Sequence, residues 1–140
     1  YNYRVGTILA AMGVSQMEQL EAFLNRNVEI RDYYNARLSI IERFANQQIV
    51  ANVQPNNWLY TVKLPRAKQL ISYLAEHKIE ARPVWVPMNR LPAGAVDLYI
   101  SHSNHSEHMS QSCLSLPCST SLTDNDLENV VSRVKRYYSV

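Results

Sequence analysis

Apolar residues recur at helical spacing through the first third of the chain. One such segment covers about residues 7–20, with Thr7 as the expected N-cap. A second runs from about Glu21 to Phe44, and its apolar stripe consists of Ile30, Tyr34, Leu38, Ile41 and Ala45. The two segments together exceed most globular helices in length, and Asn25 and Asn27 are poor helix formers. The pattern therefore predicts a long N-terminal helix with a kink or break between positions 19 and 27.

The middle of the chain alternates between strand-like and helix-like patterns. Large apolar residues alternate with mixed ones from Trp58 to Leu64, which predicts a strand. A short helix is expected at 66–77 and a second strand at 79–86. Pro83 and Pro87 remove backbone donors from this second strand, so it should lie at a sheet edge or leave the sheet early.

The last third ends in the clearest helical pattern of the sequence. A weaker helix is expected at 103–113, followed by a short extended piece at 114–117. Thr123 then provides an N-cap before an acidic first turn, and an apolar stripe follows at helical period: Leu127, Val130, Val131, Val134 and Tyr137. This order of elements favours an α/β or α+β fold, in which a small sheet is covered by helices.

Composition limits the function classes. The chain has 140 residues, 46% hydrophobic and 19% charged, which fits one globular domain. Its 14 basic residues are spread along the whole length and the net charge is only +2, so no nucleic-acid or membrane face is expected. Two cysteines, Cys113 and Cys118, fit a reducing, cytoplasmic compartment better than a disulfide.

Most familiar catalytic motifs do not occur in the sequence. The three glycines are isolated, so no phosphate-binding loop forms, and the GxSxG, HExxH and CxxC patterns do not occur. His102, His105 and His108 recur every three residues, and on a helix this spacing does not bring side chains together on one ion. We therefore expect no metal site, and these histidines fit a solvated helix start.

Two polar clusters could bind anions or rings. Asn2, Tyr3 and Arg4 precede a helix N-terminus, where backbone N–H groups and the helix dipole favour an anion, although an exposed linker turn explains them as well. The segment 82–90 places side chains suited to phosphate binding and ring stacking on a proline-stiffened strand and loop: Arg82, Trp85, Asn89 and Arg90. An edge strand with outward Arg82 and a half-buried Trp85 is the alternative.

Several motifs, taken in order, resemble one enzyme family over nearly the whole chain. They are the Tyr1–Arg4 turn, the Ala-Ala-x-Gly-x-x-Gln step at 10–16, Trp58-x-Tyr60, Arg82-Pro83-x-Trp85-x-Pro87 and Ser115-Leu116-Pro117. Their order and spacing resemble the second half of the DegT/DnrJ/EryC1/StrS family of sugar aminotransferases, which depend on pyridoxal 5'-phosphate (PLP).

The resemblance implies an architecture. The chain would be the C-terminal domain of a fold-type I PLP aminotransferase, with a small, mostly antiparallel sheet. Residues 1–20 would belong to the large-domain or dimer interface, and residues 21–140 would form the small domain. The parent enzyme would be a cytoplasmic homodimer.

The resemblance also implies site residues. Asn2 would reach across the dimer to the PLP phosphate, and Arg4, Arg82, Trp85, Asn89 and Arg90 would border the pocket for a nucleotide-linked sugar. The lysine that carries PLP would lie upstream, so no catalytic residue is expected in this chain, and the chain alone should be inactive.

The implied reaction moves an amino group from an amino acid, glutamate for example, to a nucleotide-linked keto-sugar for surface-glycan or related amino-sugar biosynthesis. This chain departs from the family at Gly6-Thr7, where a Ser-Asn pair is common, and at Asn89, where His is common. Asn89 cannot titrate, so an acid–base role at this position does not carry over. Two alternatives stay open: a PLP-dependent sugar dehydratase of the same family, and a non-catalytic dimerisation or binding module.

Overall fold

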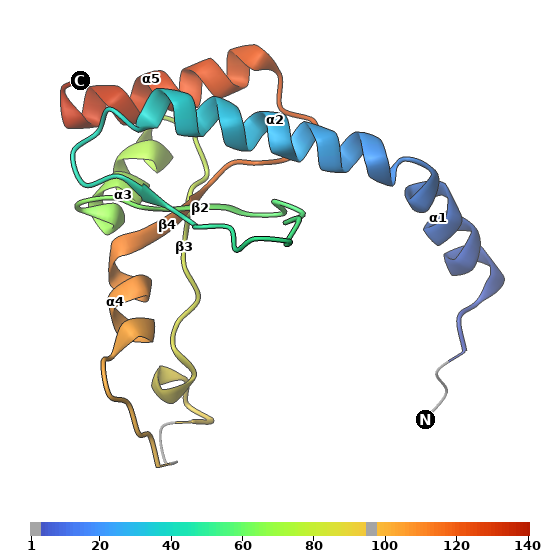
Figure 1. The fold of residues 1–140 in the computed structure, drawn as a ribbon, viewed down its shortest axis with the longest axis horizontal. Coiled ribbons are helices and arrows are strands. Elements are labelled where there is room, and N and C mark those ends of the chain that lie inside the picture. Colours follow the sequence, from blue (N-terminus) through green and yellow to red (C-terminus); the bar gives the residue numbers. More distant parts are fainter. Residues whose placement is uncertain (1–3, 95–97) are drawn as a thin grey trace.

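The computed structural model describes residues 4–94 and 98–140. Its helices and strands follow one another along the chain as shown in Figure 1. Their bounds are α1 (Thr7–Glu18), α2 (Leu20–Leu38), β1 (Ala45–Asn46), β2 (Tyr60–Lys63), α3 (Ala67–Glu76), β3 (Arg82–Pro83), the 3₁₀ turn η1 (Met88–Arg90), α4 (His105–Ser112), β4 (Cys113–Leu116) and α5 (Asp124–Tyr138).

The four strands form one sheet in the order β1-β2-β4-β3, and every neighbouring pair is antiparallel. The register pairs Tyr60 with Leu116 and Val62 with Leu114, so these four apolar side chains share one face. The opposite face carries Thr61 and the alternating residues of β4. The expected class, a small antiparallel sheet covered by helices, is confirmed.

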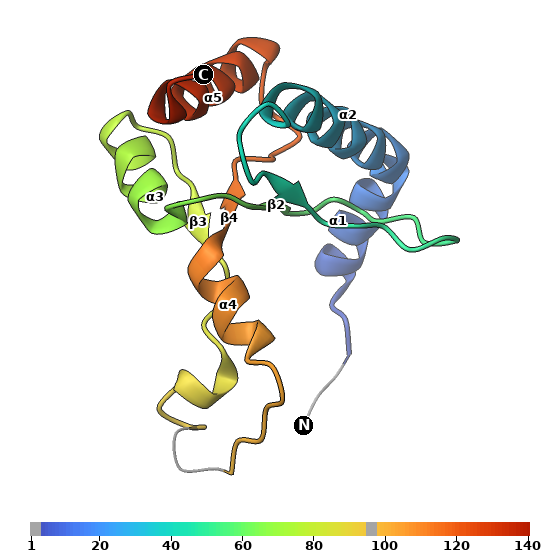
Figure 2. The ribbon, with the colours of Figure 1, turned by 60° about the vertical axis from the view of Figure 1, so that its left-hand side comes forward.

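Helices α2, α3 and α5 cover the apolar face of the sheet, and α2 lies beside α5 (Figures 1 and 2). Tyr34 of α2 is fully buried, its ring centroid lies 4.9 Å from that of Tyr60, and its hydroxyl donates to the Pro117 carbonyl over 2.9 Å. Burial raises the pKa of both tyrosines far above the usual value, so they act as packing residues and not as proton donors near neutral pH.

Helix α1 stands apart from this core. All of its residues are exposed, including Ile8 (79%) and Met17 (66%), and it points away from α5 (Figures 1 and 2). The expected break is confirmed, and it falls at Gln19, before the asparagines that suggested it. Asn25 and Asn27 lie inside α2. Among the helices of the described residues, none is long and apolar enough to cross a lipid bilayer.

Two expected boundaries are wrong, and one strand was not expected. The N-cap of α1 is Gly6, because Gly6 is extended while Thr7 is already helical. Helix α2 ends at Leu38 and not near Phe44, because the chain turns at 39–44, with Arg43 in the left-handed region (φ 63°). This turn keeps Ile41 buried and leads into β1, which the sequence pattern did not predict.

Both expected strands are shorter than their apolar patterns. Strand β2 begins only at Tyr60, which leaves Trp58 outside the sheet and 68% exposed. Strand β3 comprises Arg82–Pro83 alone and lies at the sheet edge, as the prolines predicted. The helix at α4 is confirmed within the expected range.

Helix α5 begins with the capping box that Thr123 suggested. The Thr123 hydroxyl accepts from the Asp126 backbone N–H over 3.2 Å, and Asp126 Oδ2 accepts from the Thr123 backbone N–H over 2.9 Å. The Thr123 hydroxyl also donates to Asp126 Oδ2 over 2.6 Å, and this hydrogen bond, followed by the one from the Thr123 backbone N–H, lowers the pKa of the Asp126 carboxyl. The cap fixes the start of the helix whose apolar stripe closes the core.

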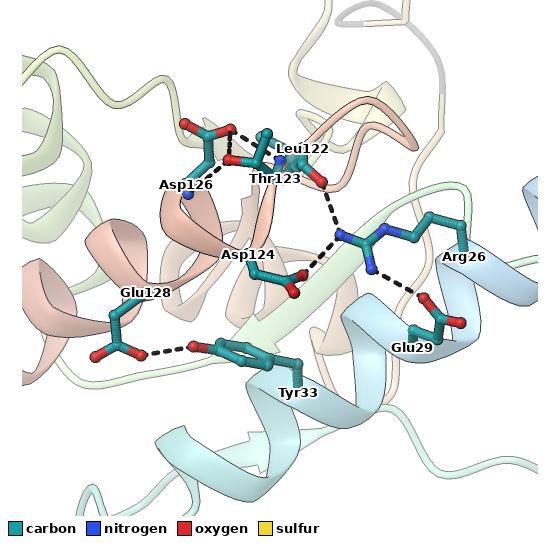
Figure 3. Close-up of polar contacts among 8 residues, drawn as sticks. All are labelled: Arg26, Glu29, Tyr33, Leu122, Thr123, Asp124, Asp126 and Glu128. Atoms are coloured by element: carbon teal, nitrogen blue, oxygen red, sulfur yellow. Dashed lines mark hydrogen bonds and ion pairs between the residues drawn. The ribbon is translucent and has the colours of Figure 1, made fainter.

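Figure 3 shows how Arg26 of α2 fastens the start of α5. Its guanidinium donates to the Leu122 carbonyl over 2.7 Å, to Asp124 Oδ1 over 3.2 Å and to Glu29 Oε2 over 2.9 Å. About two turns further along α2, the Tyr33 hydroxyl donates to Glu128 Oε2 over 2.6 Å. The two helices are therefore joined by polar contacts along their outer edge as well as by the core.

We predict that Arg26→Ala lowers the free energy of unfolding by about 1–2 kcal/mol, because three acceptors lose a charged donor. Urea denaturation of the chain measures the change. Arg43→Ala is the matched control: Arg43 pairs only with its exposed neighbour Glu42, so the loss should stay below about 0.5 kcal/mol. Equal losses for the two variants would contradict the role given to Arg26.

Candidate functional site

A long connection leaves the sheet after β3 and returns as α4. We call it the β3–α4 arm, residues 84–94 and 98–104 of the described chain. It extends away from the layer formed by α2 and α5 (Figures 1 and 2). Large apolar side chains on it are exposed, among them Trp85 (75%), Met88 (82%) and Leu98 (88%). An indole left this open offers a face on which a planar ring can stack.

The 3₁₀ turn η1 gives the arm a closed bend. Pro87 is extended and precedes the turn, Arg90 N–H donates to the Pro87 carbonyl over 2.8 Å, and Leu91 N–H donates to the Met88 carbonyl over 3.0 Å. Gly94 folds back over the turn, and a Cβ there would lie 2.5 Å from the Met88 carbonyl oxygen. Only glycine fits this close backbone approach.

Two polar side chains of the turn are of interest, the carboxamide of Asn89 and the guanidinium of Arg90. Asn89 Oδ1 is buried and has no hydrogen-bond partner among residues 4–94 and 98–140. Arg90 Nε donates to Glu107 Oε2 of α4 over 3.2 Å, and Gln111 Nε2 donates to Glu107 Oε1 over 2.6 Å. The hydrogen bond from Gln111 and then that from Arg90 lower the pKa of the Glu107 carboxyl.

Arg82 lies in a different place from the rest of the expected set. It pairs with Ser115 across the sheet, and Ser115 pairs with Thr61, so the three residues form one row. The two hydroxyls of this row lie 2.8 Å apart, and the Arg82 guanidinium is 2.9 Å from Glu80 Oε1. Arg82 lines a groove of about 660 Å³ that Trp85, Asn89 and Arg90 do not line. The structure thus separates Arg82 from the η1 turn.

Most residues that line this groove were not expected as site residues, among them Trp58, Lys78 and Asp126. The alternating pattern placed Trp58 inside a strand, whereas the strand starts two residues later. Lys78 adopts the left-handed conformation (φ 61°) after α3, a position for which glycine is the usual signal. These residues are far apart in the sequence and come together only in the folded chain, so no local sequence pattern predicts the groove.

At the other end of the chain, Arg4 is exposed and precedes α1. The Gly6 N-cap has no side-chain hydrogen bond, and the first turn of α1 has no acidic residue. Such a helix start is compatible with an anion. Asn2, the residue expected to contact the cofactor phosphate, lies outside the described residues.

The described residues do not form a complete pocket for a cofactor bound through a lysine. Lys63, Lys68, Lys78 and Lys135 are exposed or half-exposed, and they are dispersed over β2, α3, the end of α3 and α5. Over 4–94 and 98–140, no three His, Cys, Asp or Glu side chains lie close enough to hold a metal ion. Cys113 and Cys118 are both free thiols. The groups of the η1 turn and the groove can take part in ring stacking, hydrogen bonding and charge pairing.

Several solved structures share this arrangement of helices and sheet. DesV from S. venezuelae superposes with a TM-score of 0.90 at 22% identity, over 98% of this chain and 38% of that one. PseC from Helicobacter pylori, an aminotransferase of pseudoaminic acid biosynthesis, superposes at 0.87 and 18% identity, over 99% and 39%. This chain therefore shares the fold of one part of each of these proteins.

The family follows from the sequence comparison. A model of the DegT/DnrJ/EryC1/StrS aminotransferase family matches residues 1–135, and the chain belongs to this family. GDP-perosamine synthase of Escherichia coli O157:H7 is 28% identical over 142 residues, 99% of this chain and 38% of that protein. EpsN of Bacillus subtilis (strain 168), named as a pyridoxal phosphate-dependent aminotransferase, is 28% identical over 137 residues, 94% and 35%. The chain thus spans less than two fifths of the length of these relatives.

Proposed function

We propose that this chain is the sugar-facing part of a PLP-dependent aminotransferase. The reaction replaces the carbonyl oxygen of a nucleotide-linked keto-sugar with an amino group, and the donor, glutamate, leaves as its 2-keto acid. The product serves surface-glycan or related amino-sugar biosynthesis. Family membership over residues 1–135 carries the proposal, and relatives named for GDP-perosamine synthesis support a nucleotide-linked substrate.

The β3–α4 arm supplies the groups that such a substrate needs. The exposed indole of Trp85 can stack on a base or sugar ring, and the guanidinium of Arg90 can pair with a diphosphate. Asn89 has an acceptor oxygen without a partner, which a sugar hydroxyl can satisfy. Arg82 and Arg4 would add positive charge beside this site, in line with the resemblance.

The cofactor supplies the electron sink for amino transfer when it is bound. Its reactive lysine would belong to another part of the protein, since the described lysines are spread over the surface. From this chain we assign it only Asn2, which would donate its amide N–H to the PLP phosphate of the partner subunit. The support is the start of α1 at its N-cap Gly6, four positions further along the chain, which has no side-chain cap among the described residues.

We further propose that residues 1–20 pack against the large domain or the partner subunit of a homodimer, while residues 21–140 form the small domain. The support is the exposure of α1, which buries none of its apolar side chains in this chain. Four of these are 62–79% exposed: Ile8, Leu9, Met12 and Met17. Surfaces of this kind are usually covered by another protein surface.

The decisive experiment uses the full-length protein with PLP, glutamate and a panel of keto-sugars linked to GDP, UDP and dTDP. Mass spectrometry of the products should show the carbonyl replaced by an amine, together with one 2-oxoglutarate per turnover. Loss of a hydroxyl without gain of nitrogen would identify a sugar dehydratase. Absence of turnover with every sugar would contradict the proposal and leave the binding-module alternative.

We predict that the 140-residue chain self-associates, because the apolar residues of α1 have no cover within the chain. Sedimentation velocity at several concentrations should show a weight-average mass that rises with concentration. Replacing Ile8, Leu9 and Met12 by Gln should return the chain to monomer. A monomer at all concentrations, with α1 ordered in solution, would contradict the interface assignment.

A further inference from the structure

The geometry of the η1 turn points to a residue that no substrate need touch. We propose that Glu107 of α4 is a positioning residue, which holds the turn so that the Asn89 carboxamide oxygen accepts a hydrogen bond from a hydroxyl of the sugar. The inference rests on the proposed function for its substrate. Beyond that function, we assign a role to Glu107 and to Gln111, and we specify that Asn89 accepts the hydrogen bond while the sugar donates it.

The first support is the full use of the Glu107 carboxylate. One oxygen accepts from Arg90 of the turn and the other from Gln111, one helical turn further along α4. The hydrogen bond from Gln111 therefore fixes the orientation in which the Glu107 carboxylate contacts Arg90. The Glu107 side chain is 32% exposed, whereas that of Arg90 is 62% exposed, so the acid is the more firmly placed partner.

The second support is the rigidity of the two bodies that this contact joins. Helix α4 packs against α3 and runs directly into β4, the strand flanked by β2 and β3. The turn is closed by its backbone hydrogen bonds and by the close approach of Gly94 to Met88. An anchor on Arg90 therefore fixes the neighbouring residue, Asn89, as well.

The third support is the state of the Asn89 side chain. Its oxygen is buried without a donor, a condition that costs free energy unless a ligand or water supplies the hydrogen bond. A carboxamide oxygen accepts and carries no charge, so its fitting partner is a hydroxyl or ammonium group. A sugar offers several hydroxyls, and a turn held in place can select one of them.

The test uses full-length protein and five variants: Glu107→Ala, Glu107→Gln, Asn89→Ala, the double variant Asn89→Ala/Glu107→Ala, and Glu76→Ala as an exposed acid of α3 outside the site. Hydrogen exchange at the amides of Arg90, Leu91 and Gly94 reports closure of the turn. Glu107→Ala should accelerate this exchange by about threefold to tenfold, a range set by exposed charge-assisted contacts. Glu107→Gln should restore part of the protection, and Glu76→Ala should change nothing.

Kinetics provide the second readout. Glu107→Ala should raise KM for the sugar by about threefold to tenfold with kcat nearly unchanged. The same substitution should raise KM less in the Asn89→Ala background than in the wild type, because part of its effect acts through Asn89. Unchanged exchange, or additive kinetic effects, would overturn the proposal. If wild-type protein turns over no sugar, the proposed function fails, while the exchange data still decide whether Glu107 positions the turn.

Discussion

Full-length protein carrying Asn2→Ala should lose PLP about tenfold to a hundredfold more readily while its KM for the sugar stays near wild type. An amide hydrogen bond to a phosphate is charge-assisted and contributes about 1.5–3 kcal/mol in every step of the cycle, so its loss weakens cofactor retention throughout. Trp85→Ala should do the reverse and raise KM by about tenfold or more with a normal PLP spectrum, because a stacked ring loses its platform.

PLP dissociation and sugar KM, measured on the same preparations, decide between the two assignments. Arg82→Ala belongs in this series, since Arg82 lies on the sheet and pairs with Glu80, apart from the η1 turn. A small KM change for Arg82→Ala beside a large one for Trp85→Ala would restrict the sugar site to the β3–α4 arm. Retention of PLP by Asn2→Ala together with its loss from Trp85→Ala would reverse both roles.

Leu114→Ala should lower the free energy of unfolding of the chain by about 2–5 kcal/mol, the cost of a cavity in a core that cannot fully collapse. Leu114 is fully buried in β4 and lies between Val62 and Pro83 in the register. Urea denaturation followed by circular dichroism gives the change. Leu98→Ala is the control, because Leu98 is 88% exposed and should cost below about 0.5 kcal/mol. A loss under about 1 kcal/mol at Leu114 would place the core elsewhere.

Periodicity predicted the elements whose burial follows one face. The stripe of α5 and its Thr123 cap were readable because the cap, the acidic turn and the apolar spacing all agree. In α2, the residues Ile30, Tyr34 and Leu38 are all fully buried, as the spacing required. The end of α2 was misread because Ile41 continues the same spacing inside a turn.

Elements that depend on distant pairing gave no such signal. Strand β1 has two exposed residues and exists because the chain returns alongside β2. Helix α3, in contrast, lies within one residue of the expected 66–77 at both ends, because a local hydrogen bond from the Ile79 N–H to the Leu74 carbonyl closes it. A strand such as β1 is set by tertiary contacts and not by local preference.

The candidate site was readable only in part. Arg82, Trp85, Asn89 and Arg90 drew attention because guanidinium, indole and amide groups gather on a proline-stiffened segment. Arg82 lines the groove, whereas the other three residues lie on the β3–α4 arm, and this separation depends on where β3 ends. A short alternating pattern does not predict the end of a strand. Glu107 contacts Arg90 across 17 positions of sequence, so nothing local connects the two.

The edge strands of the sheet limit how this protein can pair with other chains. Strands β1 and β3 are each two residues long, and Pro83 brings no N–H group to the outer margin of β3. A neighbouring polypeptide would find too few backbone donors and acceptors there to continue the ladder. Assembly through a continuous sheet is therefore disfavoured, which agrees with the proposal that side chains on α1 and the β3–α4 arm make the contacts. Contacts of that kind can be retuned by single substitutions without disturbing the fold beneath them.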